Sequence, residues 1–377
     1  MSLTKKIRGF YISCQQELFP CVEQNYGVLP KRFRKLLLLF ELVCVEDHLP
    51  RPRHRSVGRP LAHRVRLARA FLAKVALNIP TTSGLRERLL SDVLLRSLCG
   101  WSRPCDVPSA PTFSRAFQEF AMAKLPTRIH ETLIKQGYAG ELVGHISRDS
   151  TAIEARERPV PRPPAAQPVK RRKRGRPKKG EERPKVPRRL ALQLVMELEE
   201  MLEALPKDCT VGCKRNAKGH THRWTGYKLH MDTADGGVPI SCLVTSASLH
   251  DSQAAIPLAR LTEQRVDNCY DLMDSAYDAK EIVAHRRASG RVPIIDPNPR
   301  KKKAADRRER KAQRNAGFIP AARVRYRERS TVERAFGRLK DEFGGRNIRV
   351  RGHEKVLCHR MFSGVVLTVD QMLRMVQ

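Results

Sequence analysis

Apolar residues in the first third of the chain recur every three or four positions, the spacing of one face of an α-helix. One run starts at Phe33, a second starts at Leu61, and a third passes through Leu98 and stops at Gly100. Glycine is favoured just after the last turn of a helix, so Gly100 is a natural end for the third run. The pattern predicts a mostly helical N-terminal region over residues 1–140.

Residues 85–120 contain two apolar helical runs separated by a polar turn. A second helix that carries Ser114, Arg115 and Gln118 after a short turn is similar to a helix-turn-helix, whose second helix reads DNA. An ordinary helical hairpin has the same pattern, and the sequence leaves both readings open. Arg115 is therefore a candidate DNA contact of the N-terminal region.

Beyond residue 140 the apolar period shortens toward the alternation of β-strands. Glu141–Thr151 is predicted to contain a strand that ends in Asp149, and Cys269–Tyr277 one that ends in Asp274. Further strands are predicted at 224–231, 238–244 and 291–295. Helices are predicted between the strands, and a final apolar helix, Val356 to Met375, is expected to pack against the sheet. Residues 141–377 thus read as an α/β domain with a mixed sheet and flanking helices.

The charge balance points to a polyanionic partner. The chain has 73 Lys and Arg against 39 Asp and Glu, a net charge of +34 and a pI near 10.4. Nucleic acid is favoured over a membrane, because the longest apolar stretch, Leu36–Val45, is about half a bilayer span and is interrupted by Glu41. The first residues lack the apolar core of a signal peptide, so a cytoplasmic location is expected. The ten scattered cysteines are expected to be reduced thiols.

Residues 155–189 form a basic, proline-containing insert that is predicted to be disordered. Lys or Arg occupies 12 of the 20 positions 170–189. Like-charge repulsion and proline oppose a fixed fold there. Arg174 and Arg176 flank Gly175 in a segment that resembles an AT-hook, whose arginines enter the minor groove of DNA. A basic linker attracted to phosphates is an equally good reading.

A late helix carries an unusual polar face. Tyr326, Arg329, Glu333 and Lys340 are separated by 3, 4 and 7 residues, so all four side chains return to one side of an α-helix. A carboxylate among two cations and an aromatic hydroxyl suits a metal-holding acid surrounded by phosphate contacts. A solvated, salt-bridged helix is the simpler alternative. All four letters and all three gaps match the YREK signature, and the segment therefore resembles DDE transposases from bacterial insertion sequences.

Three acids complete this resemblance: Asp149, Asp274 and Glu333. Phosphodiester chemistry needs hard oxygen ligands for two divalent cations, here Mg²⁺ or Mn²⁺, about 4 Å apart. Two acids from strand ends and one from a packed helix can supply them. The strings around Asp149 and Asp274 are similar to the first and second acid motifs of the family. The resemblance implies a ribonuclease-H-like catalytic core over residues 141–377, preceded by a helical region that binds DNA.

The resemblance also implies an activity and partners. A member of this family cleaves double-stranded DNA at the terminal inverted repeats of its element and joins the ends to target DNA. Tyr326, Arg329 and Lys340 would contact phosphates near the cut, and a homodimer would hold both ends in a bacterial, nucleoid-associated complex. Members that cut through a DNA hairpin carry a large β-rich insert between the second and third acids. The stretch from Asp274 to Glu333 is too short for one, so a hairpin pathway is not supported.

Several alternatives stay open at this point. The chain could be an inactive or domesticated DNA-binding protein derived from a transposase, or a stand-alone nuclease that never joins ends. A structural zinc site is a weak alternative because its spacing is loose; it would use Cys209, Cys213, His220 and His222. His250 could approach the active site, although a role in a helix-capping loop is the simpler reading.

Overall fold

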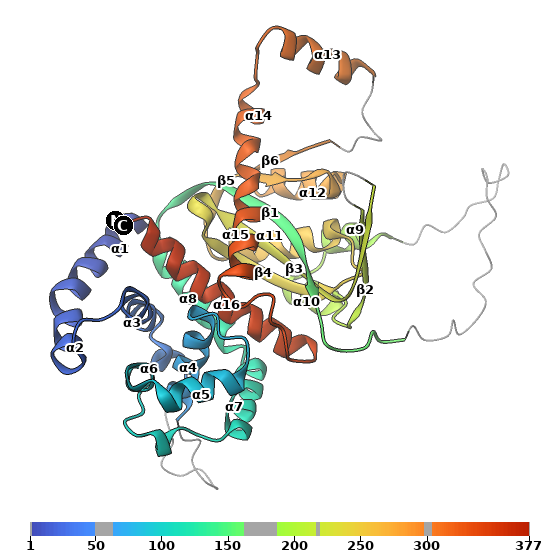
Figure 1. Ribbon diagram of the computed structural model, residues 1–377. Coiled ribbons are helices and arrows are strands. Elements are labelled where there is room, and N and C mark those ends of the chain that lie inside the picture. Colours follow the sequence, from blue (N-terminus) through green and yellow to red (C-terminus); the bar gives the residue numbers. More distant parts are fainter. Residues whose placement is uncertain (1, 50–62, 162–186, 216–218, 298–303, 377) are drawn as a thin grey trace.

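The computed structural model describes residues 2–376 except for 50–62, 162–186, 216–218 and 298–303 (Figure 1). As predicted, the N-terminal region is mostly helical. Its α-helices are α1 (Leu3–Ser13), α2 (Phe19–Tyr26), α3 (Lys31–Val43), α4 (Arg64–Ala76), α5 (Thr82–Ser91), α6 (Val93–Cys99), α7 (Ala110–Met122) and α8 (Leu125–Gly137). Short π or 3₁₀ turns lie at Cys14–Leu18, Val45–His48 and Pro104–Asp106.

The helix predicted to run through Leu98 is divided into α5 and α6. Asp92 has extended backbone angles, φ −94° and ψ 105°, and its carboxylate accepts a hydrogen bond from the Leu95 amide at 2.9 Å. An acidic residue that caps a new helix in this way ends the previous one. The predicted stop at Gly100 is confirmed, since Gly100 has φ 101°.

Six strands of the described residues form one mixed sheet. They are β1 (Leu142–Glu154), β2 (Thr210–Arg215), β3 (Thr221–Ala234), β4 (Pro239–Ser246), β5 (Asp267–Met273) and β6 (Val292–Ile295). β3 pairs antiparallel with β1 and, on its other edge, with β2 and β4, whereas β5 pairs parallel with β1 and β6. The predicted mixed sheet is confirmed, and the order β4-β3-β1-β5-β6 fits a ribonuclease-H-like core.

Helices of the C-terminal part lie between the strands in the chain or follow the last one. They are α9 (Arg189–Gln193), α10 (Leu198–Ala204), α11 (Ala255–Glu263), α12 (Lys280–Ala288), α13 (Ala304–Asn315), α14 (Ala321–Tyr326), α15 (Ser330–Asp341) and α16 (His353–Arg374). Helix α13 projects away from the sheet (Figure 1). Further 3₁₀ turns lie at Asp235–Gly237, Asp251–Ala254, Ser275–Tyr277 and Arg327–Arg329.

The C-terminal helix α16 lies between the sheet and the N-terminal helices (Figure 1). Its expected contact with the sheet is present at β4, and it also packs against α4, α7 and α8. Phe362 of α16 lies in one aromatic cluster with Phe71 of α4 and Phe117 of α7. The apolar core is therefore continuous from the N-terminal helices to the sheet.

The two faces of β1 carry different chemistry because successive side chains point to opposite sides of a strand. On one face Arg148 donates two hydrogen bonds to Asp232, at 2.8 and 2.6 Å, and both side chains are fully buried. Asp271 lies 3.6 Å from Arg148 and accepts a hydrogen bond from Arg286 at 2.6 Å. We call these four residues the ionic network; Arg286 also pairs with Glu263 at its edge. The next residue, Asp149, points to the other face.

Candidate active site

Asp149 faces α15, as do Ser147 and Thr151, which lie two residues before and after it on β1. The Ser147 hydroxyl donates to the backbone oxygen of Glu328 at 3.0 Å, and the Thr151 hydroxyl accepts from Lys340 at 2.6 Å. These bonds fix the helix against this face of the strand. The prediction that the strand ends in Asp149 is wrong: β1 continues to Glu154 because β3 pairs with it as far as that residue.

Asp274 lies beside Asp149 at the edge of β1 where β5 stops. The last aligned residues of the two parallel strands are Arg148 and Met273, so the two aspartates come next in both strands. The strand predicted to end in Asp274 ends one residue earlier, at Met273, and the Asp274 carboxylate accepts from the Ala276 amide at 2.9 Å, capping a 3₁₀ turn. We call Asp149 and Asp274 the acid pair.

The nearby cations compensate the negative charge of the acid pair only in part. Burial raises the pKa of Asp149 to about 6, and the negative charge of Asp274 adds to the rise, while the cations of Lys214 and Arg329 oppose it. Burial also raises the pKa of Asp274. A carboxyl group with a raised pKa holds its charge at a cost, which an additional cation at the pair would remove.

Glu333 approaches the acid pair through Arg329. The Arg329 guanidinium lies 3.4 Å from an oxygen of Asp149 and donates a second hydrogen bond to Glu333. It also lies over the Tyr326 ring, 5.9 Å from its centre. The predicted face therefore brings three of its four side chains into contact with one another, although the helix tightens into a 3₁₀ turn at Arg327–Arg329.

Lys340, the fourth member of that face, reaches β1 at Thr151, two residues beyond Asp149. Burial lowers its pKa, and the nearby cations of Arg360 and Arg346 lower it further. A partly desolvated ammonium group among other cations attracts an anion strongly. Lys340 thus extends the charged surface from the acid pair along β1.

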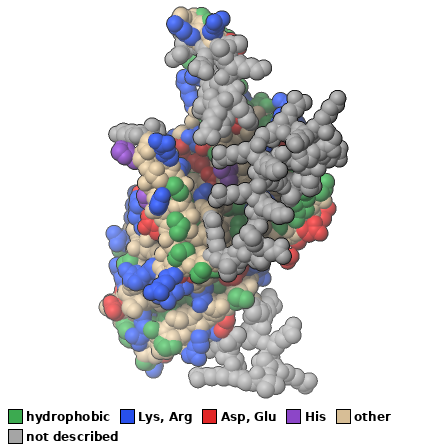
Figure 2. Space-filling model, turned by 90° about the vertical axis from the view of Figure 1, so that its right-hand side faces the viewer, with side chains coloured by type: hydrophobic (Ala, Val, Ile, Leu, Met, Phe, Trp, Pro, Cys, Tyr) green, Lys and Arg blue, Asp and Glu red, His purple; other side chains and the backbone are tan. Residues whose placement is uncertain are grey.

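A cavity of about 750 Å³ opens beside the acid pair, with Asp274 and Lys340 in its wall. Figure 2 shows Lys and Arg side chains spread over one face of the molecule, including its lower part, where the N-terminal helices lie. Other residues that line the cavity are Lys214, Arg215, His222, Trp224, Lys228, His250, Asp251, Arg346 and Arg360. Cations outnumber acids in this wall, which suits a polyanionic substrate.

Arg360 is the residue that the sequence reasoning missed. It is 3% exposed, and burial lowers its pKa to about 9. Its Nε and Nη1 atoms have no hydrogen-bond partner among the residues that the structure describes. A Cβ atom added at Gly345 would lie 2.6 Å from Nη1, so glycine makes room for the guanidinium. The available signal was the pair His359-Arg360 in the first half of the largely apolar stretch Val356 to Met375.

Two further residues that the sequence drew attention to lie in or near this cavity. His250 lines it, and its Nδ1 also accepts a hydrogen bond from the Ser252 amide at 3.4 Å, capping a 3₁₀ turn. Both readings of His250 are therefore correct. The ring of Trp224 stacks on His222 with 5.9 Å between the ring centres.

Arg115, the basic insert and the predicted zinc ligands are the remaining candidates. Arg115 is exposed on α7, beside the buried Ala116 and Phe117. Arg174 and Arg176 lie outside the described residues, as does most of the basic insert. The four side chains of the zinc alternative form no metal-binding group in the described part of the chain.

Two family models match the chain. The model described as a transposase DDE domain matches residues 149–368, more than half of the sequence. The chain belongs to the DDE-domain transposase family. A second model, described as a transposase domain (DUF772), matches residues 29–119, which cover α3 to most of α7. Comparisons with curated proteins and with solved structures find no match.

The matched segment of this transposase starts at Asp149 and includes Asp274 and Glu333. DDE transposases generally use divalent metal ions. No three His, Cys, Asp or Glu side chains gather into a metal-holding group within the described ranges, and Arg329 contacts both Asp149 and Glu333. The donor set nevertheless fits a hard cation, since all three groups are carboxylates and two of them have raised pKa values.

One structural finding concerns the membrane. In the part of this transposase that the structure describes, no helix is both long and apolar enough to cross a bilayer.

Proposed function

We propose that this transposase cleaves DNA at the ends of a bacterial insertion sequence and joins the freed 3′-hydroxyls to target DNA. The observation that carries the proposal is the acid pair, which lies against the helix that holds Glu333 and the phosphate-binding candidates. Asp149, Asp274 and Glu333 would hold two divalent cations, Mg²⁺ or Mn²⁺. Such ions activate the attacking oxygen and stabilise the leaving oxygen of a phosphodiester.

The residues around the acids would bind and orient the DNA. Arg329 would leave Glu333 and grip a phosphate near the cut, for which its planar fork is well shaped. Lys340, held at Thr151, would supply a point charge one step farther along β1. Tyr326 lies against Arg329 and would support its position.

Other parts of the chain would hold the ends of the element. In this proposal the helical N-terminal region binds the terminal inverted repeats, with Arg115 on the exposed side of α7. Arg174 and Arg176 of the basic insert add minor-groove or phosphate contacts. Two copies of the chain hold the two ends in one complex in the bacterial cytoplasm, near the nucleoid. Between Asp274 and Glu333, β6 is the one strand in the described ranges, which supports a route without a hairpin.

Cleavage by a Glu333→Gln variant tests this function. The substrate is a linear duplex that carries the DNA flanking the coding region, incubated with Mg²⁺ and analysed on denaturing gels. We expect the variant to lose cleavage by about a thousandfold or more, because a metal ligand is removed, while its affinity for the duplex is retained.

Glu328→Gln is the matched control, since Glu328 is exposed on the preceding turn and only its backbone oxygen contacts β1. It should cleave at the wild-type rate. Cleavage that persists in Glu333→Gln would contradict the assignment. A wild-type protein that binds the duplex but forms no Mg²⁺-dependent product would favour an inactive DNA-binding protein, and cleavage without joining would favour a nuclease.

A further inference from the structure

A second cavity lies where the N-terminal helices meet the C-terminal segment. Its volume is about 440 Å³, and residues from α4, the start of α5, α7, the segment after α15 and α16 line it. We call it the junction pocket. It combines residues of both matched transposase segments, since α4 and most of α7 lie in 29–119 and α16 lies largely in 149–368. It is separate from the cavity beside the acid pair.

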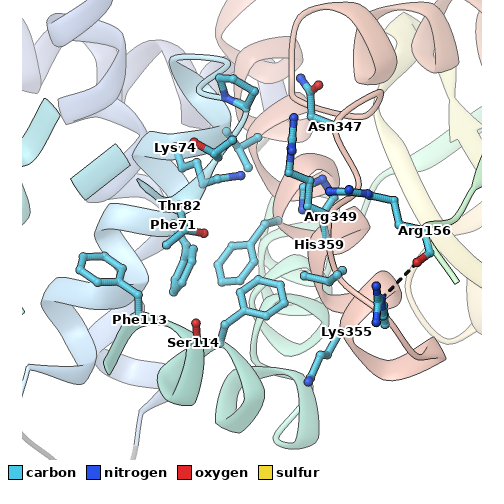
Figure 3. A pocket seen from close by; sticks show the side chains of 17 residues that line it. Phe71, Lys74, Thr82, Phe113, Ser114, Arg156, Asn347, Arg349, Lys355 and His359 are labelled. Carbon is cyan, nitrogen blue, oxygen red and sulfur yellow. Dashed lines mark hydrogen bonds between the residues drawn. The ribbon is translucent and has the colours of Figure 1, made fainter. Parts of the chain in front are cut away.

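The wall of the junction pocket is basic and contains no Asp or Glu among its described residues. The basic or imidazole side chains are Lys74, Arg156, Arg349, Arg351, Lys355 and His359. Figure 3 shows that Lys74 comes from one side and that Arg349, Arg156 and Lys355 come from the other. Cations that surround a hollow without a carboxylate repel one another unless an anion enters.

Lys74 gives the strongest indication that the junction pocket binds an anion. Its residue surface is only 9% exposed, and no hydrogen bond or ion pair joins its ammonium group to another described residue. Burial, together with the nearby charge of Arg349, lowers the pKa of Lys74 to about 8. A buried ammonium group is normally paired, because leaving it unpaired costs free energy. This arrangement is destabilising for the free protein and useful for a protein that binds an anion.

The rest of the wall strengthens the attraction for an anion. Phe71, Phe113, Phe117 and Phe362 form an apolar side, which lowers the local dielectric and strengthens any charge pair formed there. Thr81 and Thr82 add the start of α5, a helix of ten residues whose positive end faces the pocket. The unpartnered, buried Lys74 is an observation independent of that helix end.

We propose that the junction pocket binds a backbone phosphate of the DNA, held between Lys74 and Arg349. The inference rests on the proposed DNA substrate and adds a contact outside the acid site. A phosphate here would connect the N-terminal helices to the catalytic core through the same DNA molecule. Binding at this place would therefore report that DNA occupies both parts of the transposase at once.

Lys74→Met and Arg349→Gln test this pocket. Binding of a fluorescent duplex is measured by anisotropy in EDTA over a series of KCl concentrations, with the flanking-DNA duplex and with a random duplex. We expect each variant to lose about tenfold in affinity on both duplexes, since a phosphate contact carries no sequence information. The plot of log affinity against log salt should become shallower by about one unit.

The double variant Lys74→Met/Arg349→Gln sharpens the test. If both cations hold one phosphate, the affinity of the double variant for DNA should be only slightly lower than that of the weaker-binding single variant. The salt slope of the double variant should again fall by about one unit. Two additive losses, with a fall of about two units, would overturn the shared phosphate.

Lys135→Met is the matched control. Lys135 lies on α8, is paired with Glu131 at 2.6 Å and does not line the pocket, so its replacement should leave DNA binding unchanged. Lys74→Met should also unfold at a higher temperature than the wild type without DNA, because an unpaired buried charge is removed. Arg349 is exposed, so Arg349→Gln carries the test if Lys74→Met does not fold.

Unchanged affinity and salt slope in both single variants would overturn the proposal. The proposal would also be overturned if the pocket bound a free phosphate compound in place of DNA. In that case inorganic phosphate or AMP would raise the melting temperature of the wild type and not of Lys74→Met, while the two proteins would bind DNA equally well. Failure of the proposed cleavage is a separate result. A protein that binds DNA through Lys74 and never cuts it would keep the pocket and remove the nuclease chemistry.

Discussion

Arg148 and Asp149 are neighbours on β1, yet the charged groups around the two side chains differ. Arg148 is fully buried and is satisfied by Asp232 within the ionic network. Asp149 is also buried, but its neighbour is a second acid, Asp274, and its pKa is raised to about 6. The charge of Arg148 is paired inside the chain, whereas the charge of Asp149 is only partly compensated by Arg329, as expected for the metal-binding role that we propose. The junction pocket is the corresponding case with the opposite sign.

Breaking the ionic network should have the largest effect on stability. Arg148→Met leaves Asp232 buried without its cation, and we expect the free energy of unfolding to fall by about 3 to 5 kcal/mol. Chemical denaturation followed by circular dichroism measures the change. Arg34→Met is the control, because Arg34 pairs with Glu23 near the surface, where an ion pair contributes below about 1 kcal/mol.

The double variant Arg148→Met/Asp232→Leu refines this result. Replacing both charges removes the unpaired carboxylate, so much of the lost stability should return. An Arg148→Met variant as stable as the wild type would show that the network does not hold β1 in place. The contrast between the two faces of the strand would then be lost.

The sequence predicts local features of this fold well. The helical spacing of the N-terminal region, the stop at Gly100 and the strand before Asp274 depend on neighbouring residues, and the structure confirms them. The end of β1 was missed because it is set by pairing with β3, about 80 residues away in the chain. Pairing between distant segments leaves little trace in either one alone.

The candidate site was predicted in part for the same reason. Helical spacing placed Arg329 beside Glu333, and the structure shows this contact. The bridge from Arg329 to Asp149 and the burial of Arg360 depend on how α15 and α16 pack, which spacing does not reveal. The functional roles of Asp149, Asp274 and Glu333 rest on the family resemblance and remain predictions.

Neutralising Asp149 should stabilise the metal-free protein. Asp149→Asn removes a buried charge beside Asp274, and we expect a gain of about 2 kcal/mol in the free energy of unfolding at pH 7.5 in EDTA. The folded protein holds a proton on Asp149 between about pH 4 and pH 6 that the unfolded chain has released. The contribution of Asp149 to wild-type stability should therefore fall as the pH rises through this window, and the gain of the variant should shrink toward pH 4.

Asp267→Asn is the control for this measurement, because Asp267 begins the same strand as Asp271 but is exposed and paired with Arg291. It should not gain stability at pH 7.5. Equal stability of Asp149→Asn and the wild type from pH 4 to pH 7.5 would mean that the acid pair is already compensated within the protein. The two faces of β1 would then differ in the arrangement of their side chains and not in how well their charges are compensated.

The smallest expected effect concerns Arg329, whose guanidinium lies 3.4 Å from an oxygen of Asp149. It lies between Asp149 and Glu333, so it either competes with a metal ion or presents Glu333 to it. We expect Arg329→Met to bind Mn²⁺ about two- to fivefold more tightly in the absence of DNA, because a partly exposed ion pair contributes below about 1 kcal/mol. Calorimetric titration measures this affinity. The control is Arg327→Met, because Arg327 is exposed on the same turn.

Weaker binding by Arg329→Met would mean that the guanidinium orients Glu333 for the metal, and the helix would then be a preformed part of the site.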